Sequence, residues 1–174
     1  ITIMTNHILQ AEAPVLRAPA APVAAADFGT PALIDELRRM SAALGACDDG
    51  VALAAPQIGL SKRIFVVSGK VFGKEGEPPP PDQVFINPEI VKTSRKKVVL
   101  EEGCLSVSGG ISGEVERPEK ITLEGRDKNG KKLKIKAWGL LARVFQHEVD
   151  HLNGMLFIDR TKNVRGLDKN LQHK

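Results

Sequence analysis

Residues 146–152, Gln-His-Glu-Val-Asp-His-Leu, are the stretch whose residue types and spacing are best suited to chemistry. Positions four apart project from nearly the same face of an α-helix, so His147 and His151 can bind one metal ion together. Glu148 then lies beside any water on that ion, which is the H-E-x-x-H arrangement of metal-assisted hydrolases. Because this motif has few fixed positions, a helix that carries two histidines by chance is the competing interpretation.

The helix that must position these residues is predicted to be buried. It begins at Gly139, and apolar residues cover most of its circumference: Leu140, Leu141, Val144, Phe145, Val149 and Leu152. Asn153 and Gly154 supply a left-handed cap that ends it. Histidines and acids on a buried helix cost free energy unless they are paired or bound to metal, so the pattern favours a metal site.

A third protein ligand must come from elsewhere, because a catalytic metal centre usually has three protein ligands and one open position. Asp159 and His173 are candidates downstream of the motif. Cys104, in a glycine-flanked loop after a predicted strand, is the candidate upstream. A thiolate with two imidazoles suits Zn²⁺ and Fe²⁺ alike, so these donors leave the metal open.

The remaining segments predict an α+β fold of short, mainly antiparallel strands around the central buried helix that carries H-E-x-x-H. Thr30 and Pro31 begin a second helix, packed outside, as its N-cap and first helical residue. The predicted strands are residues 63–68, 84–86, 98–100, 121–127 and 131–137. The last two alternate apolar and polar residues around Asn129-Gly130, which indicates a hairpin.

Two proline-containing segments lead to further expectations. We expect Asn87-Pro88 to end the strand at 84–86, with residues 90–91 available to extend the sheet beyond it. Residues 11–27 are rich in Ala and Pro, so we expect an extended arm on the surface, with a flexible linker or a targeting remnant as the alternative.

Length and composition bound the class of protein. A chain of 174 residues suits one domain, residues 1–174, with a sizeable core. Aromatic residues make up only 4%, which argues against a base-stacking platform and direct nucleic-acid recognition. No apolar run is long enough to span a membrane. The net charge of +4 tolerates a polyanionic neighbour such as a ribosome but does not predict one.

Cysteine content and the first residues bear on the compartment. Cys47 and Cys104 cannot build a disulfide framework, which favours a reducing compartment. Residues 1–10 lack the charged and apolar regions of a signal peptide. We therefore expect a cytoplasmic location in a bacterium, with an organelle matrix after removal of a transit peptide as the alternative.

Three stretches together resemble the peptide deformylases. Residues 50–57 are similar to that family's G-x-G-x-A-A-x-Q, residues 102–106 carry E-G-C-L-S, and residues 146–152 carry Q-H-E-x-D-H-L. Their order and spacing match, and the similarity extends through most of the chain. The resemblance implies a metal-dependent hydrolase that removes the N-formyl group from the N-terminal formylmethionine of newly made polypeptides and releases formate. It is compatible with transient proximity to the ribosome.

The resemblance also implies roles for particular residues. Three would hold one divalent ion, commonly Fe²⁺ in the family, with Zn²⁺, Ni²⁺ or Co²⁺ as alternatives: Cys104, His147 and His151. A metal-bound water would attack the formyl carbon, with Glu148 as general base. The Gln57 side-chain amide and the Leu105 backbone N–H would stabilise the oxygen of the tetrahedral intermediate. Six residues would contact the substrate: Gly50, Val51, Ala52, Gly103, Leu140 and Val144.

One departure and two alternatives accompany this hypothesis. Ala52 stands where the family has its second glycine, so its methyl group can alter pocket width or preference. A zinc peptidase that cleaves internal peptide bonds is one alternative function, and a binding module that keeps the metal as a structural staple is the other. Glu102, Arg117 and Asp150 either support the site from behind or are ordinary surface charges.

Overall fold

The structure is a computed structural model that describes residues 7–166, so His173 lies outside the described residues. The α-helices are α1 (Pro31–Gly45) and α2 (Gly139–Leu152). The strands are β1 (Ala52–Ala54), β2 (Ile64–Val67), β3 (Gln83–Thr93), β4 (Lys97–Gly103), β5 (Ser112–Pro118), β6 (Lys120–Arg126), β7 (Lys132–Trp138) and β8 (Val164–Arg165). Short 3₁₀ turns are η1 (Pro14–Arg17), η2 (Ala25–Asp27), η3 (Ala55–Ile58), η4 (Gly69–Val71) and η5 (Phe157–Asp159).

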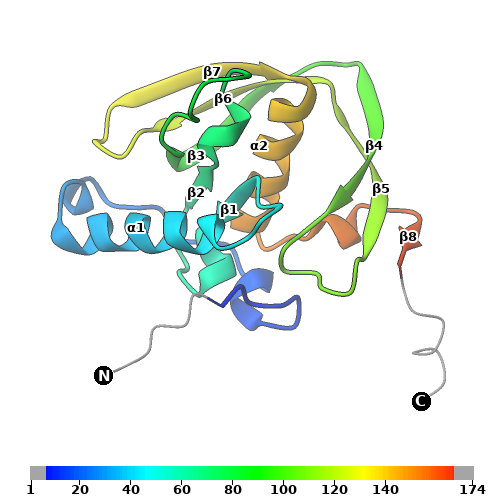
Figure 1. The fold of residues 1–174 in the computed structure, drawn as a ribbon, viewed down its shortest axis with the longest axis horizontal. Coiled ribbons are helices and arrows are strands. Elements are labelled where there is room, and N and C mark those ends of the chain that lie inside the picture. The colour runs from blue at the N-terminus through cyan, green and yellow to red at the C-terminus, as the bar shows by residue number, and fades with distance from the viewer. Residues whose placement is uncertain (1–6, 167–174) are drawn as a thin grey trace.

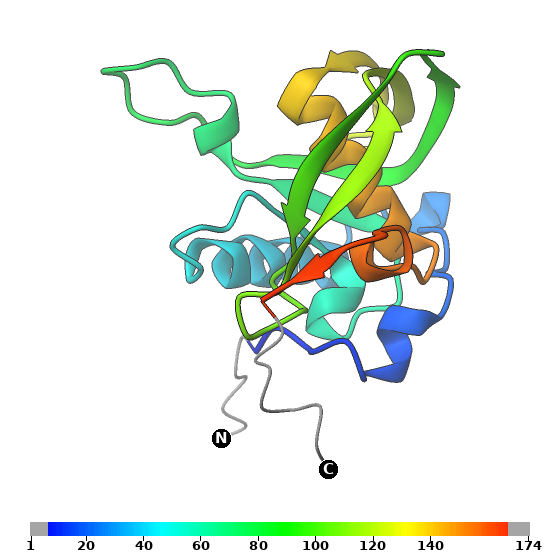
Figure 2. The ribbon, with the colours of Figure 1, turned by 90° about the vertical axis from the view of Figure 1, so that its right-hand side faces the viewer.

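The strands form a five-stranded sheet, in the order β1-β2-β3-β6-β7, and a three-stranded sheet, in the order β4-β5-β8. All strand pairings within these two sheets are antiparallel. Helix α2 lies between the sheets (Figure 1), and the β4–β5 hairpin passes in front of it when the molecule is turned (Figure 2). The α+β class expected from the sequence is therefore confirmed. Within residues 7–166, no helix is both long and apolar enough to cross a membrane.

Strand β2 shows how the layers are built, because both of its faces are buried. Phe65 and Val67 face α2, whereas Ile64 and Val66 belong to the cluster that contains the apolar side of α1. Successive side chains of a strand point to opposite faces, so one strand serves both helices. A strand buried on both sides is a continuous apolar run, as the sequence of residues 64–67 shows.

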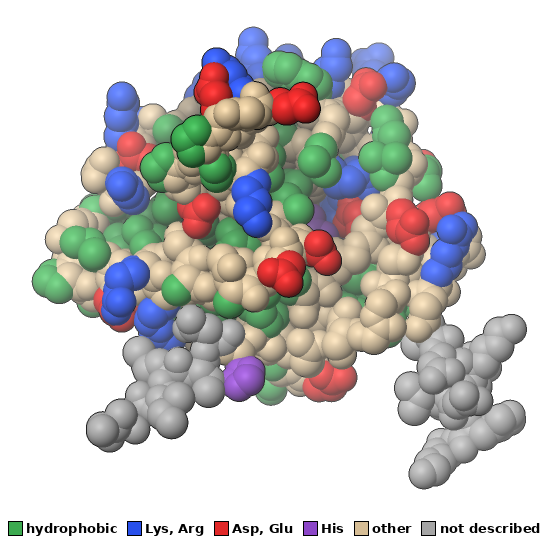
Figure 3. Space-filling view, in the orientation of Figure 1, with side chains coloured by type: hydrophobic (Ala, Val, Ile, Leu, Met, Phe, Trp, Pro, Cys, Tyr) green, Lys and Arg blue, Asp and Glu red, His purple; other side chains and the backbone are tan. Residues whose placement is uncertain are grey.

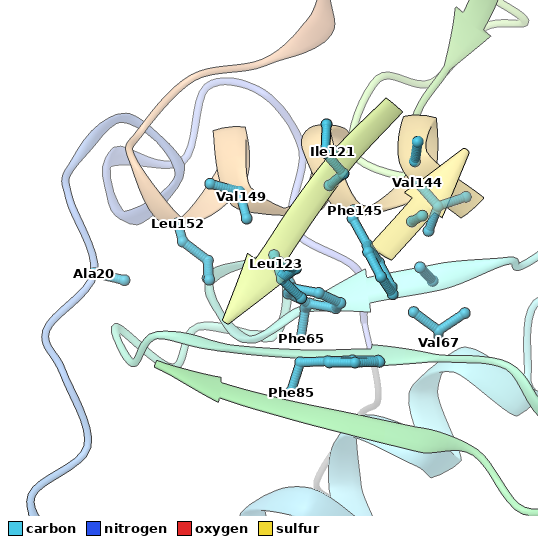
Figure 4. Close-up of a cluster of buried hydrophobic side chains, with 14 residues drawn as sticks. Ala20, Phe65, Val67, Phe85, Ile121, Leu123, Val144, Phe145, Val149 and Leu152 are labelled. Carbon is cyan, nitrogen blue, oxygen red and sulfur yellow. The ribbon is translucent and has the colours of Figure 1, made fainter. Parts of the chain in front are cut away.

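The core beneath α2 is built around three phenylalanine rings (Figure 4). Phe85 lies 4.7 Å from Phe65 and 4.8 Å from Phe145, measured between ring centroids. Phe145 comes from α2 and the other two rings come from β2 and β3, so this contact fixes the helix on the sheet. Aromatic pairs at such distances add to the free energy of simple burial.

Helix ends follow the local sequence signals. The Thr30 hydroxyl accepts a hydrogen bond from the Leu33 N–H at 3.3 Å, as an N-cap does. Helix α2 ends at Leu152, and Gly154 adopts the left-handed conformation with φ 75°. The bounds predicted for the motif-bearing helix are therefore confirmed. The hairpin around Asn129-Gly130 is confirmed as β6–β7, with Gly130 at φ 82°.

Two expectations about proline-containing segments need correction. Strand β3 does not end at Asn87-Pro88 but continues to Thr93. Asn87, at a positive φ of 50°, and Pro88 fall in a register shift between the paired residues Ile86 and Glu89, so the missing proline N–H breaks no pairing with β2 or β6. The Asn87 amide side chain also hydrogen-bonds the backbone of Val23. The segment 11–27 contains two 3₁₀ turns and buries Leu16 and Val23, so it is not simply an extended surface arm.

Candidate metal centre

Three potential metal ligands converge where the turn after β4 meets α2. One ligand atom from each of Cys104, His147 and His151 lies within 4.8 Å of the others. The Cys104 Sγ lies 3.2 Å from the His151 Nε2. Asp159, the other described candidate ligand, instead pairs with Arg17 at 2.6 Å and caps the Leu156 N–H. The structure thus joins a thiol from mid-sequence to two imidazoles near the end of the chain.

Glu102 sets the orientation of the first histidine. Its Oε2 lies 3.1 Å from the His147 Nδ1, which leaves Nε2 as the ring nitrogen available to a metal. Burial alone would lower the pKa of His147, but hydrogen bonds with Cys104 and Glu102 raise it to about 10. Burial, and next the positive charge of His147, lower the pKa of His151 well below its ordinary value. The site therefore favours one positive charge between these groups and a neutral imidazole at His151.

The charges behind the histidines form a buried network. Arg117 donates to both oxygens of Glu102, at 2.6 and 2.9 Å, and to Asp150 at 2.8 Å. Glu102, Arg117 and Asp150 are only 6%, 4% and 5% exposed, so they are not ordinary surface charges. Burial would raise the pKa of Glu102, but hydrogen bonds from Arg117 and His147 hold it well below its ordinary value. These three residues hold α2 against β4 and β5.

Two arginines that the sequence analysis did not single out complete this network. Arg143 donates to Glu102 at 2.6 Å and also to the carbonyl oxygens of Val98 and Val115. Arg160 donates to both oxygens of Asp150, each at 2.6 Å. A signal for Arg143 was available, because it lies four residues before His147 on a helix predicted to be buried. Arg160 lies beyond the helix, where the sequence shows no such periodicity.

Gln57 is buried and held with its amide nitrogen towards the ligands. Its Oε1 accepts a hydrogen bond from the Ala54 N–H at 2.8 Å, which fixes the amide orientation. Its Nε2 then donates to the Ser106 hydroxyl at 3.1 Å and lies 3.6 Å from the Cys104 Sγ. Leu105 follows Cys104 directly, and its N–H has no acceptor among the residues that the structure describes. The two N–H donors that lie against the thiol are the Gln57 Nε2 and the Ser106 N–H, which is 3.4 Å from the Sγ.

Unsatisfied buried polar atoms are concentrated at this site. Among the side chains of residues 7–166, the buried atoms without a hydrogen-bond partner are the Glu148 Oε2 and the His151 Nδ1. Buried polar atoms are nearly always paired, so an orphaned carboxylate oxygen indicates a missing partner. Burial raises the pKa of Glu148 to about 7. The carboxylate is therefore placed to exchange a proton rather than to form a structural ion pair.

A cavity of about 730 Å³ opens onto these groups. Eleven of the residues singled out from the sequence line it: Val51, Ala52, Gln57, Glu102, Gly103, Cys104, Leu105, Leu140, Val144, His147 and Glu148. His151 is buried behind the cavity, and Gly50 packs against Leu44 outside its lining. Further lining residues escaped the sequence analysis: Asp49, Glu101, Val107, Gly110, Ile111 and Arg143. On the face seen in Figure 3, histidine atoms are visible within a recess.

Comparison with known proteins assigns this arrangement to a family. The family model described as polypeptide deformylase matches residues 5–166. The chain belongs to the polypeptide deformylase family. A peptide deformylase of Halothermothrix orenii is 47% identical over 153 residues, which cover 87% of this chain and 90% of that protein. One from Rhizobium meliloti is 47% identical over 147 residues, 84% of this chain and 79% of that protein.

Solved deformylase structures agree with this assignment. An actinonin-bound class I type b peptide deformylase from Acinetobacter baumannii superposes with a TM-score of 0.78 at 35% identity, over 90% of this chain and 97% of that one. An inhibitor complex of the Plasmodium falciparum peptide deformylase gives a TM-score of 0.76 at 38% identity, over 90% and 89% of the two chains. As a deformylase, the protein is an amidohydrolase that removes the N-formyl group of newly made polypeptides.

The residues present fit the divalent metal on which deformylases depend. A thiol and two imidazoles form a donor set that binds Zn²⁺ and Fe²⁺ well, and the described residues place them within reach of one ion. The carboxylate on His147 is the support that a metal-bound histidine commonly has.

Proposed function

We propose that the protein removes the formyl group from N-terminal formylmethionine and releases formate, with Cys104, His147 and His151 holding one divalent cation. The observation that carries this proposal is the buried Glu148 Oε2 beside the three converging ligands, for which residues 7–166 offer no hydrogen-bond partner. A metal ion that only stabilises the fold would not require such a carboxylate beside it. We propose that residues 1–174 act as one catalytic domain.

The proposed ion is Fe²⁺, with Zn²⁺, Ni²⁺ and Co²⁺ as alternatives, because the donor set suits all of them. When bound, such a cation supplies a Lewis acid and lowers the pKa of a water towards neutrality. Elemental analysis of protein purified without oxygen identifies the ion. Activity that decays in air would support Fe²⁺, since iron and thiolate both oxidise.

Glu148 is proposed as the general base and then the general acid. Its Oε2 would take the proton from the attacking water and pass it to the leaving amine, as the proton balance of amide hydrolysis requires. The position supports this role, because Glu148 lines the cavity while its neighbour His147 reaches the ligand cluster. The absence of a competing partner within the described residues leaves Oε2 available to the water.

Gln57 and Leu105 are proposed to stabilise the oxygen that becomes negative in the transition state. The Ala54 N–H holds the Gln57 amide so that its Nε2, rather than its Oε1, faces the ligands. Leu105 follows Cys104 in the sequence and is one of the residues that line the same cavity. One well-placed donor of this kind contributes roughly 3 kcal/mol to transition-state stabilisation.

The substrate backbone is proposed to lie along Val51, Ala52 and Gly103, which line the cavity between β1 and β4. The methionine side chain would enter the apolar part formed by Leu140 and Val144. Gly50 lies outside the lining, where an added Cβ would come within 2.9 Å of the Leu44 side chain. We propose that Gly50 acts by setting the path of Val51.

The proposed substrate also suggests where in the cell the protein acts. Newly made formylated polypeptides are produced at ribosomes, so we propose transient proximity to the ribosome. The bacterial relatives support the cytoplasm of a bacterium as the location, with an organelle matrix as the alternative.

Replacing Glu148 by Ala tests the mechanism. We expect turnover of a formyl-Met dipeptide to fall by roughly 100-fold or more, while the metal content and the circular dichroism spectrum stay unchanged. Glu116→Ala, at an exposed position, is the matched control and should keep full turnover. Unaltered turnover in Glu148→Ala would remove Glu148 from the mechanism. Cleavage of an unformylated internal peptide without release of formate would instead identify a zinc peptidase.

A further inference from the structure

The outer face of the five-stranded sheet is strongly basic where β3, β6 and β7 meet. The inner face there is apolar, since Ile121, Leu123 and Ala137 pack against α2. Alternation along the strands therefore turns the intervening side chains outwards. We define the basic face as its outward cations: Lys92, Lys120, Arg126, Lys132, Lys134 and Lys136.

No helix among the described residues covers this face. Helix α1 packs on the same side of the sheet, but its apolar cluster reaches only β1, β2 and the first part of β3, through Leu53, Val66 and Ile86. That cluster contains no residue of β6 or β7. In Figure 1, α1 lies below, away from the β6–β7 hairpin at the top of the molecule.

The charge on this face is unbalanced. It carries six cations against two outward carboxylates, Glu89 and Glu124. The excess of four equals the formal net charge of the whole chain, +4, so the remainder is neutral overall. Within residues 7–166, Lys134 is the one cation of the face that forms an ion pair, with Glu124 at 2.6 Å. Lysine and arginine side chains project along the upper edge in Figure 3.

The arrangement of these charges suits a repeating polyanion. Lys132, Lys134 and Lys136 alternate along one strand, so their side chains leave the sheet in a straight row at intervals of about 7 Å. Such a row is fixed by the sheet, unlike a cluster of lysines on a mobile loop. A membrane-binding surface would combine its cations with a broad apolar face, whereas the exposed apolar residues on the described strands of this face are two side chains on different strands, Val91 of β3 and Trp138 at the end of β7.

One end of the basic face lies beside the active-site cavity. Strand β7 ends at Trp138, which is 68% exposed, and Leu140 two residues later lines the cavity. Lys120 and Trp138 also line a groove of about 270 Å³ together with Arg143. Arg143 lines the active-site cavity as well, so the groove and the cavity are neighbours.

We propose that the basic face docks on the phosphodiester backbone of RNA. The contact is electrostatic and independent of base sequence, which agrees with the scarcity of aromatic residues for base stacking. The proposal does not depend on the catalytic mechanism. Docking would hold the cavity close to an RNA surface such as that of the ribosome, from which formylated polypeptides emerge.

Binding of the full chain to a fluorescent RNA duplex of about 20 base pairs tests the proposal. We expect measurable binding at about 50 mM salt that weakens steeply as salt rises, since counterions are released. The variant K132E/K134E/K136E should lose roughly tenfold or more of this affinity, and K132Q/K134Q/K136Q should lose less. All should deformylate a formyl-Met dipeptide at the wild-type rate, which separates RNA docking from catalysis.

The matched control is K70E/K74E/K162E, which changes the net charge equally at exposed lysines of other elements. It should retain RNA affinity within about threefold. Bound RNA should also shield Trp138, the single tryptophan of the chain, from quenching by acrylamide. Equal losses in the two triple charge reversals, no binding by the wild type, or binding only to phosphatidylserine vesicles would each overturn the proposal.

Discussion

Replacing Arg117 by Met probes the buried network that supports the metal centre. The substitution keeps an apolar side chain of similar reach and removes three hydrogen bonds, two to Glu102 and one to Asp150. Glu102 would retain Arg143 and His147 as partners, and Asp150 would retain Arg160.

The expected loss of unfolding free energy depends on how well Glu102 and Asp150 remain paired after the substitution. Removing one partner of a buried ion pair costs about 3–5 kcal/mol because a charge is left uncompensated. Since the remaining arginines compensate part of the charge, we expect the low end, about 3 kcal/mol. For a chain of this length that lowers Tm by roughly 6–12 °C.

The assay is denaturant unfolding in the presence of a chelator. Metal binds the folded state and adds to its apparent stability, so metal-free protein isolates the effect of the network. Lys97→Met is the matched control on the same pair of strands, since Lys97 and Glu116 lie 3.1 Å apart and are 55% and 58% exposed. An exposed pair contributes at most about 1 kcal/mol. Metal affinity, measured separately, should fall roughly 10–100-fold in Arg117→Met as Glu102 loses its orientation.

The result that refutes this reasoning is a loss of under about 1 kcal/mol in Arg117→Met, similar to that of Lys97→Met. The network would then not act as an electrostatic unit. Retained stability combined with lost metal affinity would contradict the stability estimate while leaving the role of Glu102 intact.

Two further substitutions test the fold and the cavity. Gly154→Ala should lower the free energy of unfolding by more than about 1 kcal/mol, because Gly154 has φ 75° and an added Cβ would lie 2.9 Å from the Arg17 carbonyl carbon. The control is Gly45→Ala, whose added Cβ meets no atom within 4 Å, and it should be neutral or slightly stabilising in thermal unfolding. Equal effects at the two glycines would contradict this. Ala52→Gly should widen the cavity and leave the metal content unchanged. The ratio of kcat/KM for a formylated dipeptide with a bulky second residue to kcat/KM for one with a small second residue should rise a few-fold. An unchanged ratio would show that the Ala52 methyl group does not restrict the substrate.

Some features were predictable because they depend on residues close together in the chain. The spacing of His147 and His151 implies one helical face, and the apolar pattern around them correctly predicted the helix from Gly139 to Leu152. The Asn129-Gly130 turn likewise predicted the β6–β7 hairpin. Strand β3 was the exception, because it continues past Asn87-Pro88 through a register shift in its pairing with β6, a strand distant in sequence.

The charged groups around the site could not be predicted from local sequence patterns. Glu102, Arg117 and Asp150 could be surface charges or buried partners, and only packing of α2 against β4 and β5 distinguishes the two. Arg160 joins them from beyond the helix. Likewise, the sequence shows a mild net charge of +4, but only the pairing of β3, β6 and β7 places that excess on one uncovered face.

The sequence by itself determined the helix, its pair of imidazoles and the carboxylate between them, because helical geometry relates residues one turn apart without help from the rest of the chain. Residue type and spacing left the third group open among Cys104, Asp159 and His173, and the family resemblance alone implied Cys104. Tertiary structure brings Cys104 to the histidines, because the packing of β4 beside α2 places its thiol 3.2 Å from the His151 imidazole, 47 positions away in sequence, whereas Asp159 pairs with Arg17. Such long-range contacts depend on how whole elements pack, and no spacing rule encodes them.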